Sequence, residues 1–165
     1  MSSVLTKHHT PRVRQRSASH HSATSTSLFH RQSIRGEWTL NRQASTLSPG
    51  AAAVQSGVVR IEHRDPIFRY KATFVSASGP LQYEYELQSD GRDVGAIQNG
   101  VTTLSNLRWE GEALVARSRI QRPNDSEMRI SFRYELIDGG SRLRAVEQLR
   151  GGEQEQDNIW IFDRR

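Results

Sequence analysis

Cysteine is absent from the 165 residues of this chain, which excludes disulfide bonds, thiolate metal sites and cysteine nucleophiles. Long hydrophobic runs are absent too, since the purely apolar stretches are only a few residues long. A membrane-spanning helix needs about 20 apolar residues and a secretory signal needs a continuous apolar region, so the sequence as given predicts neither. We therefore expect a cytoplasmic protein without a transmembrane segment.

Acidic residues are missing from the first 35 residues, which hold six Lys or Arg, five His and twelve Ser or Thr. A segment of this composition cannot bury enough apolar surface to offset the entropy cost of ordering it. We predict a disordered basic tail at residues 1–33 and a single folded domain at residues 34–165. Three functional interpretations of the tail stay open: a transit peptide, an anion-binding arm, or a weak metal-binding tract at His8-His9 and His20-His21. An over-extended start of the reading frame would look the same.

The net charge of +5 is a property of this tail, because the remaining residues hold 17 basic and 18 acidic side chains. A basic protein usually suggests a nucleic-acid partner, but here the folded part is close to neutral. Nucleic acid or another anionic surface is therefore expected as a partner only through the tail.

Alternation of apolar and polar residues is the main pattern of the folded part. From Met128 to Leu136 every second residue is apolar and those between are polar or charged, which is the period of a half-buried strand. The turn-forming residues 138–141 follow, and residues 142–149 alternate again, so this stretch predicts a β-hairpin. Further strands are predicted at residues 34–41, 54–62, 68–74, 81–88, 101–109, 112–121 and 156–164.

Three details complete the prediction of the strands. The segment from His63 to Pro66 should interrupt the chain, because proline cannot donate to a strand ladder. Residues 94–98 lie between two turn signals and form either a short edge strand or a loop. Leu104 is out of phase with its apolar neighbours, and a β-bulge is one explanation. Without any segment of helical period, the sequence predicts an all-β domain, an antiparallel up-and-down barrel of about eight to ten strands.

Catalytic and metal-binding chemistry has little support in this sequence. His63 is the one histidine after residue 35, it is not accompanied by a nucleophile motif, and we expect it to be structural or solvent-exposed. Zinc needs three or four protein ligands, and a haem-binding barrel needs an axial histidine. We therefore predict no catalytic residue, no metal site and no cofactor, and a non-enzyme is favoured.

Aromatic side chains gather on the expected inward faces of three strands, and their hydroxyls and rings suit a small amphipathic ligand. The alternative is that they fill the core of the barrel. These candidate ligand-binding residues are Tyr70, Phe74, Tyr83, Tyr85, Phe132 and Tyr134. The opposite faces of neighbouring strands carry six arginines, namely Arg117, Arg119, Arg129, Arg133, Arg142 and Arg144. We expect them to pair with outward carboxylates, and the alternative is that they form an anion-binding surface.

Two short motifs at the ends of the folded part carry a family resemblance. Gly36-Glu37-Trp38 at the first strand and Phe162-Asp163-Arg164 at the last, with a barrel-length meander between them, resemble the calycin superfamily, the lipocalins and their fatty-acid-binding relatives. With Asp90-Gly91-Arg92 in mid-chain, residues 34–165 look most like small bacterial lipocalin-like proteins of unassigned function. In that superfamily the first Trp packs at the closed end of the barrel beneath an Arg of the last strand. The resemblance implies this closing role for Trp38 and Arg164.

The predicted function is non-catalytic binding of a small apolar or amphipathic molecule inside the barrel. This prediction rests on the inward aromatic residues and on the resemblance. The alternative is a plugged barrel that serves as a scaffold while the basic tail binds an anionic partner.

Overall fold

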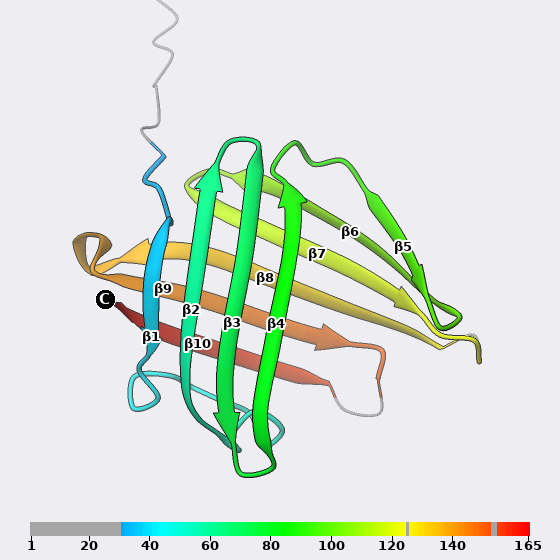
Figure 1. The fold of residues 1–165 in the computed structure, drawn as a ribbon, viewed down its shortest axis with the longest axis horizontal. Coiled ribbons are helices and arrows are strands. Elements are labelled where there is room, and N and C mark those ends of the chain that lie inside the picture. Colours follow the sequence, from blue (N-terminus) through cyan, green and yellow to red (C-terminus); the bar gives the residue numbers. More distant parts are fainter. Residues whose placement is uncertain (1–30, 125, 153–154) are drawn as a thin grey trace, which may run out of the picture.

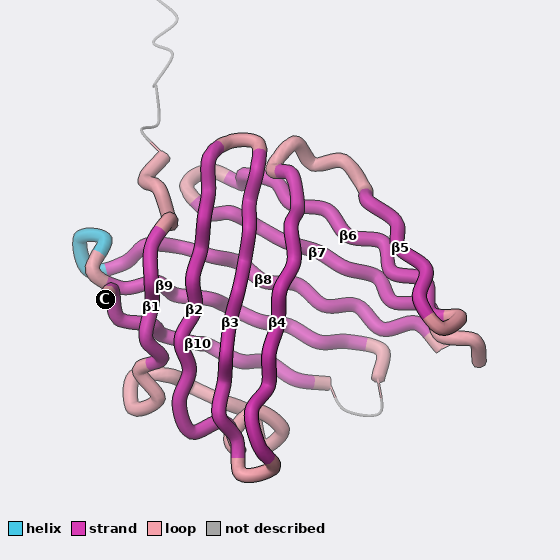
Figure 2. The backbone as a smooth tube through the Cα atoms, in the orientation of Figure 1, coloured by secondary structure: helices cyan, strands magenta, loops and turns pink. Residues whose placement is uncertain are grey.

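The computed structural model describes residues 31–124, 126–152 and 155–165, and its fold is all-β (Figure 1). Apart from one short 3₁₀ turn, η1 (Asp138–Gly140), the regular structure of these residues consists of strands joined by loops (Figure 2). The ten strands are β1 (Gly36–Leu40), β2 (Val54–Arg64), β3 (Ile67–Ser76), β4 (Gly79–Gln88), β5 (Val94–Gln98), β6 (Val101–Glu110), β7 (Ala113–Gln121), β8 (Glu127–Ile137), β9 (Arg142–Arg150) and β10 (Gln156–Arg164). The predicted antiparallel barrel of eight to ten strands is confirmed.

The strands form one sheet in the order β4-β3-β2-β1-β10-β9-β8-β7-β6-β5. Both ends of the folded part meet in this sheet, because β1 pairs with β10 and Trp38 lies opposite Arg164. The sheet folds over so that β1 to β4 form one wall and β5 to β10 cross behind them as the other (Figure 1). The consecutive strands β4 and β5 do not pair, and an isolated bridge between Asp90 and Arg108 joins the walls at one end of this gap. The barrel is therefore nearly closed.

Strand pairing settles the three details that the sequence left open. Residues 94–98 form an edge strand, since β5 pairs along its length with β6. The pairing of β6 with β7 is continuous through Leu104, so the bulge proposed there is wrong and Leu104 simply points outward, opposite Arg119. The interruption at residues 63–66 is also shorter than predicted, because Arg64 still pairs with Ile67 and only two residues form the turn.

The turn between β8 and β9 follows directly from its residues. Asp138, Gly139 and Gly140 all have positive φ, at 52°, 67° and 88°. Glycine adopts this region without steric cost and aspartate tolerates it, so the sequence Asp-Gly-Gly favours the tight reversal.

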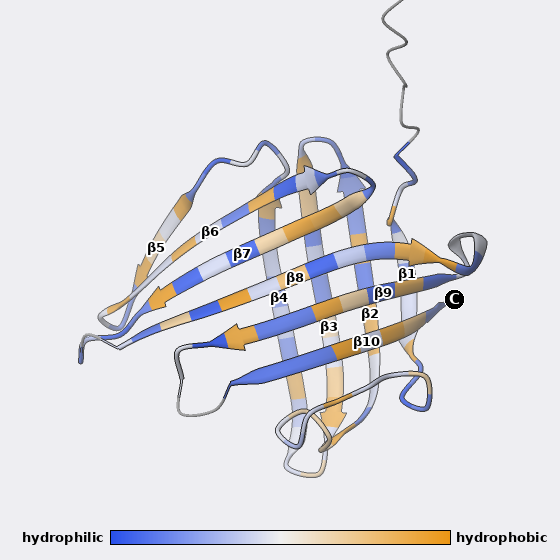
Figure 3. Ribbon diagram, turned by 180° about the vertical axis from the view of Figure 1, so that it is seen from behind, coloured by the Kyte–Doolittle hydropathy of each residue, from blue (hydrophilic) through white to orange (hydrophobic). Residues whose placement is uncertain are grey.

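The core is packed tightly at the end of the barrel near β1. Trp38, Phe68, Leu107, Leu114 and Leu143 are completely buried there. Figure 3 shows that β7 and β10 are apolar in the half that lies near β1 and mostly polar in the other half. One end of the interior is thus a solid core, so a functional site is expected at the other end.

The predicted tail lies, up to residue 30, outside the described residues, and so do its two His-His pairs. Among the residues that are described, no helix is long and apolar enough to cross a membrane.

Candidate functional site

The inward side chains of β6 to β10 form three successive rows across the wall. The tryptophan row, which is mostly buried, consists of Trp109, Leu114, Tyr134, Ala145 and Trp160. The glutamate row, in which Phe132 and Glu147 are half-buried, consists of Leu107, Ala116, Phe132, Glu147 and Asn158. The serine row, half-buried throughout, consists of Ser105, Ser118, Ile130, Leu149 and Gln156. Burial therefore decreases row by row along the interior.

The facing wall shows the same gradient. On β4 the inward residues Tyr85 and Leu87 are half-buried, whereas Tyr83 is 51% exposed and Leu81 38% exposed. Val94 on the edge strand β5 is 50% exposed. Apolar side chains on inward faces thus remain accessible at the end of the barrel where β4 and β5 diverge.

Four of the six candidate aromatic residues meet in one cluster between the walls. Tyr70 and Tyr85 lie opposite each other on β3 and β4, with stacked rings 4.9 Å apart. The Tyr85 and Tyr134 hydroxyl oxygens lie 3.2 Å apart, a hydrogen bond that joins the two walls. Phe132 stacks on Tyr134 with a centroid distance of 5.8 Å. We call Tyr70, Tyr85, Phe132 and Tyr134 the aromatic cluster.

Burial sets the ionisation of the three tyrosines in this cluster. It raises the pKa of Tyr85 to about 12, despite the opposing effect of the hydrogen bond with Tyr134. Burial first, and then the neighbouring hydroxyls and Glu147, also hold the pKa of Tyr70 and Tyr134 well above the ordinary value. All three hydroxyls are therefore neutral near pH 7 and can both donate and accept hydrogen bonds.

The other two candidates, Phe74 and Tyr83, lie elsewhere. Their rings meet edge to face at 6.1 Å, and Phe74 also contacts Trp160 at 5.7 Å. Phe74 is buried and belongs to the core, whereas Tyr83 stays exposed beside the gap. The six residues therefore form two groups rather than one lining.

Glu147 is an inward residue that the sequence reasoning missed. It lies between Phe132 on β8 and Asn158 on β10. Its Oε2 accepts hydrogen bonds from Trp160 Nε1 at 2.7 Å and from Asn158 Nδ2 at 3.0 Å. The signal was available, because Glu147 continues the alternation of Leu143 and Ala145 and therefore had to point inward.

Trp38 and Arg164 lie together at the packed end. The Arg164 guanidinium is 4.3 Å from the centre of the Trp38 ring. Arg164 also donates to the backbone oxygens of Gly140 and Arg35, and Trp38 Nε1 donates to Ile34 O at 3.1 Å. These contacts tie the last strand to the segment that precedes the first.

His63 has a structural environment at the closed end of the gap. Its Nε2 lies 2.9 Å from Asp65 Oδ1, and its ring packs against Phe68 and Trp109. Asp65 Oδ1 also accepts a hydrogen bond from Trp109 Nε1 at 3.2 Å, which links the β2–β3 turn to β6. Within the described ranges, no group of three or more His, Asp or Glu is placed to hold a metal ion.

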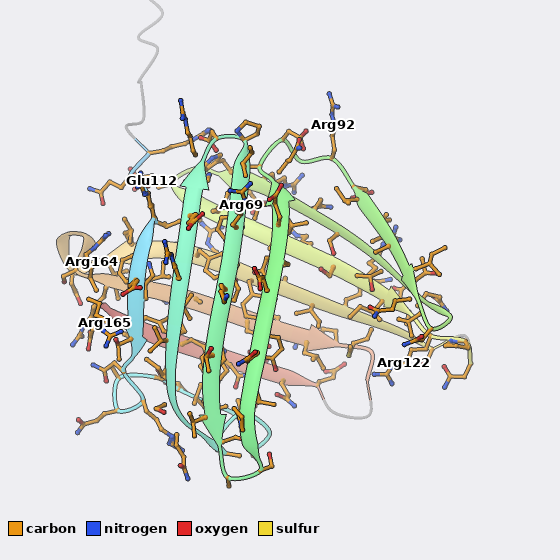
Figure 4. All side chains as sticks on the ribbon, viewed as in Figure 1. Arg69, Arg92, Glu112, Arg122, Arg164 and Arg165 are labelled. Atoms are coloured by element: carbon orange, nitrogen blue, oxygen red, sulfur yellow. The ribbon has the colours of Figure 1, made fainter. Side chains whose placement is uncertain are left out.

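The outer face carries the charges of the strands. Figure 4 shows Arg69 on the outer side of β3, where its Nε donates to Glu86 at 2.7 Å. Five of the six arginines singled out in the sequence lie within ion-pair distance of carboxylates, namely Arg117 and Arg133 with Glu110, Arg133 and Arg144 with Glu135, Arg129 with Glu127, and Arg142 with Asp163. Exposed pairs of this kind stabilise a fold by only about 0 to 1 kcal/mol each.

Comparison with known proteins gives the fold. The sequence matches no model of a protein family and no curated protein. Solved structures do match: an SAHS (abundant heat soluble) protein from Ramazzottius varieornatus is 10% identical, with 79% of this chain and 94% of that chain covered and a TM-score of 0.53. Lipid binding protein 8 from Caenorhabditis elegans is 12% identical, with 80% and 95% covered and a TM-score of 0.53. Human cRBP IV is 14% identical, with 81% and 99% covered and a TM-score of 0.50.

At these identities the likeness shows the fold alone, and each of these proteins is covered over nearly its whole length. Ten antiparallel strands in a nearly closed barrel, with the first and last strands paired, agree with the resemblance drawn from the two terminal motifs. The chain has the fold of the calycin, lipocalin-like β-barrels.

Proposed function

We propose that this protein binds one small apolar or amphipathic molecule between the two walls of its barrel and does no chemistry on it. The observation that carries this proposal is the exposure of inward apolar side chains beside the gap, with Tyr83, Leu81 and Val94 between 38% and 51% exposed. Apolar surface that faces the interior but is not packed by the protein can be covered by a ligand. Each Å² of apolar surface removed from water contributes about 25 cal/mol of favourable transfer free energy, part of which offsets the entropy cost of binding.

Two further features support the proposal. The aromatic cluster supplies ring faces together with neutral hydroxyls, which suit a molecule with an apolar body and one polar end. One of the solved structures of this fold is of a protein named for lipid binding. A fold does not dictate a function, so the proposal rests chiefly on the exposed interior.

The test begins with native mass spectrometry of the protein purified from its own source, which would detect a bound molecule by its mass. Titration with a neutral dye that fluoresces in apolar surroundings then measures binding, and fatty acids serve as competitors. We expect saturable dye binding with one site per chain.

A matched pair of variants locates the site. Tyr83→Ala removes an exposed side chain from the inward face of β4, and Ile97→Ala removes a more exposed one from the outward face of β5. We expect Tyr83→Ala and Phe132→Ala to weaken dye binding at retained fold and Ile97→Ala to leave it unchanged. Equal effects of Tyr83→Ala and Ile97→Ala, or a protein that never binds the dye, would contradict the proposal.

A further inference from the structure

The charge of the interior is carried by a single acidic residue. Glu147 is the one carboxylate on the inward positions of the ten strands, and it lies at the boundary between the packed and the exposed rows. Its Oε2 is held by Trp160 and Asn158, and Asn158 is itself fixed because its Oδ1 accepts from Ser48 N at 2.7 Å. No donor among the described residues reaches Oε1. The carboxylate is therefore positioned, with one oxygen left for another partner.

Positive charge does not offset Glu147 inside the barrel. Among Lys and Arg, Arg164 is the one residue on an inward strand position of the described residues, and it is engaged at the far end with Trp38, Gly140 and Arg35. The other strand arginines and Lys71 lie on outward positions. A half-buried carboxylate without a counterion is costly, and an incoming cation would lower that cost.

Aromatic rings surround this carboxylate. Phe132 is its cross-strand neighbour, and Trp160 is hydrogen-bonded to it. Tyr70 and Tyr134 are close enough for its charge to act on their hydroxyls. Ring faces attract cations, and aromatic residues around a carboxylate are the usual chemistry for recognising an ammonium group.

We propose that the ligand is an amphipathic amine, whose ammonium group pairs with Glu147 Oε1 beside the aromatic cluster. Its apolar part lies along Tyr83 and the two apolar members of the serine row, Ile130 and Leu149. This inference deepens the proposed function and rests on it. A carboxylate or phosphate end would meet Glu147 as a like charge, so such ligands are disfavoured.

The experiment compares three competitors with the same alkyl chain and different polar ends: dodecylamine, dodecanol and dodecanoate. Each displaces the neutral dye from the full chain at about pH 7, where the amine is protonated and the acid ionised, and below micelle-forming concentrations. We expect the amine to bind at least about tenfold more tightly than the alcohol and the carboxylate to bind most weakly.

Glu147→Gln tests the residue itself, because the amide has nearly the same shape and keeps an oxygen for Trp160 Nε1. Its matched control is Glu84→Gln, which alters an exposed carboxylate on the outer face of β4. In Glu147→Gln the preference for the amine over the alcohol should disappear while the neutral dye still binds. Glu84→Gln should behave like the unaltered protein.

The outcomes separate this inference from the proposed function. A protein that binds neither dye nor competitor overturns both. The amine inference is overturned, and apolar binding is left intact, if the dye binds but the amine competes no better than the alcohol. The same conclusion follows if dodecanoate is the tightest competitor. An amine preference that survives Glu147→Gln removes Glu147 from the site.

Discussion

Replacing Trp38 by alanine should lower the free energy of unfolding by about 4 kcal/mol, within the range of about 3 to 5 for a large aromatic residue in a core. The ring is completely buried, so its removal leaves a cavity that rigid strands on both sides cannot fill. The change also frees Ile34 O from the 3.1 Å hydrogen bond with the indole and leaves the Arg164 guanidinium without the ring beneath it.

A double-mutant cycle isolates the contact between Trp38 and Arg164. Arg164→Met keeps most of the aliphatic stem and removes the charge, so it should cost about 1 to 3 kcal/mol for the lost hydrogen bonds to Gly140 O and Arg35 O and the lost contact with the ring. In the double variant the loss should be smaller than the sum of the single losses, by about 0.5 to 2 kcal/mol, because the shared contact is counted twice.

Urea unfolding followed by circular dichroism measures these losses, and an unchanged slope with denaturant shows that the unfolded state is not altered. Trp38→Phe is the control, because it keeps a buried ring and loses mainly the indole hydrogen bond. A loss below about 1 kcal/mol in Trp38→Ala, or additive losses in the cycle, would refute the assigned role of this pair in closing the barrel.

Three other predictions follow from single features. Burial raises the pKa of Tyr85 to about 12 from 10.0, so the folded chain keeps a proton that the unfolded chain releases. The contribution of Tyr85 to stability should therefore be complete below pH 10 and fall by up to about 3 kcal/mol as the pH rises to 12. Because the pKa values of Tyr70 and Tyr134 are raised as well, Tyr85→Phe should lessen the alkaline loss of stability in urea titrations rather than abolish it. Gly57→Ala should destabilise by about 1 to 3 kcal/mol, because a Cβ there would overlap the Phe74 ring. Gly95→Ala meets nothing closer than 3.9 Å and should be neutral or slightly stabilising in the same assay. Deleting residues 1–33 should abolish any salt-dependent binding to nucleic acid, and binding that survives the deletion would remove the tail from that role.

Strand periodicity predicted most of the fold, because each strand carries its own pattern. The last strand was placed at its observed bounds, residues 156–164, and the hairpin around Gly139 followed from residues that tolerate positive φ. Leu104 shows what strand periodicity alone cannot distinguish. An apolar residue on an outward position looks the same in sequence as a bulge, and only the partner strand distinguishes the two.

The candidate site was harder to predict, because knowing that a side chain points inward does not tell how deeply it is buried. Phe74 and Tyr85 both point inward and both contact the opposite wall, yet Phe74 is buried in the core against Trp160 whereas Tyr85 is only half-buried. Which rows are packed depends on how far the walls separate, a property of the whole sheet rather than of one strand. Glu147 could have been predicted, since its inward position follows from the alternation of residues along β9.

The gap between β4 and β5 leads to a last prediction, which concerns hydrogen exchange of the backbone amides. Pairing these strands would bury Leu81, Tyr83 and Val94, so the gap leaves apolar surface in water and two strand edges unpaired. A ligand that covers the same side chains should reduce the motion of the two unpaired strands. The backbone amides of these strands should therefore exchange with solvent more slowly in the complex. We expect hydrogen exchange measured by mass spectrometry to slow in β4, β5 and the serine-row part of β8 on addition of the ligand, with little change around Trp38, where the core is already solid. Protection confined to the outer face or to β1 and β10 would place the ligand outside the barrel and contradict the proposed site.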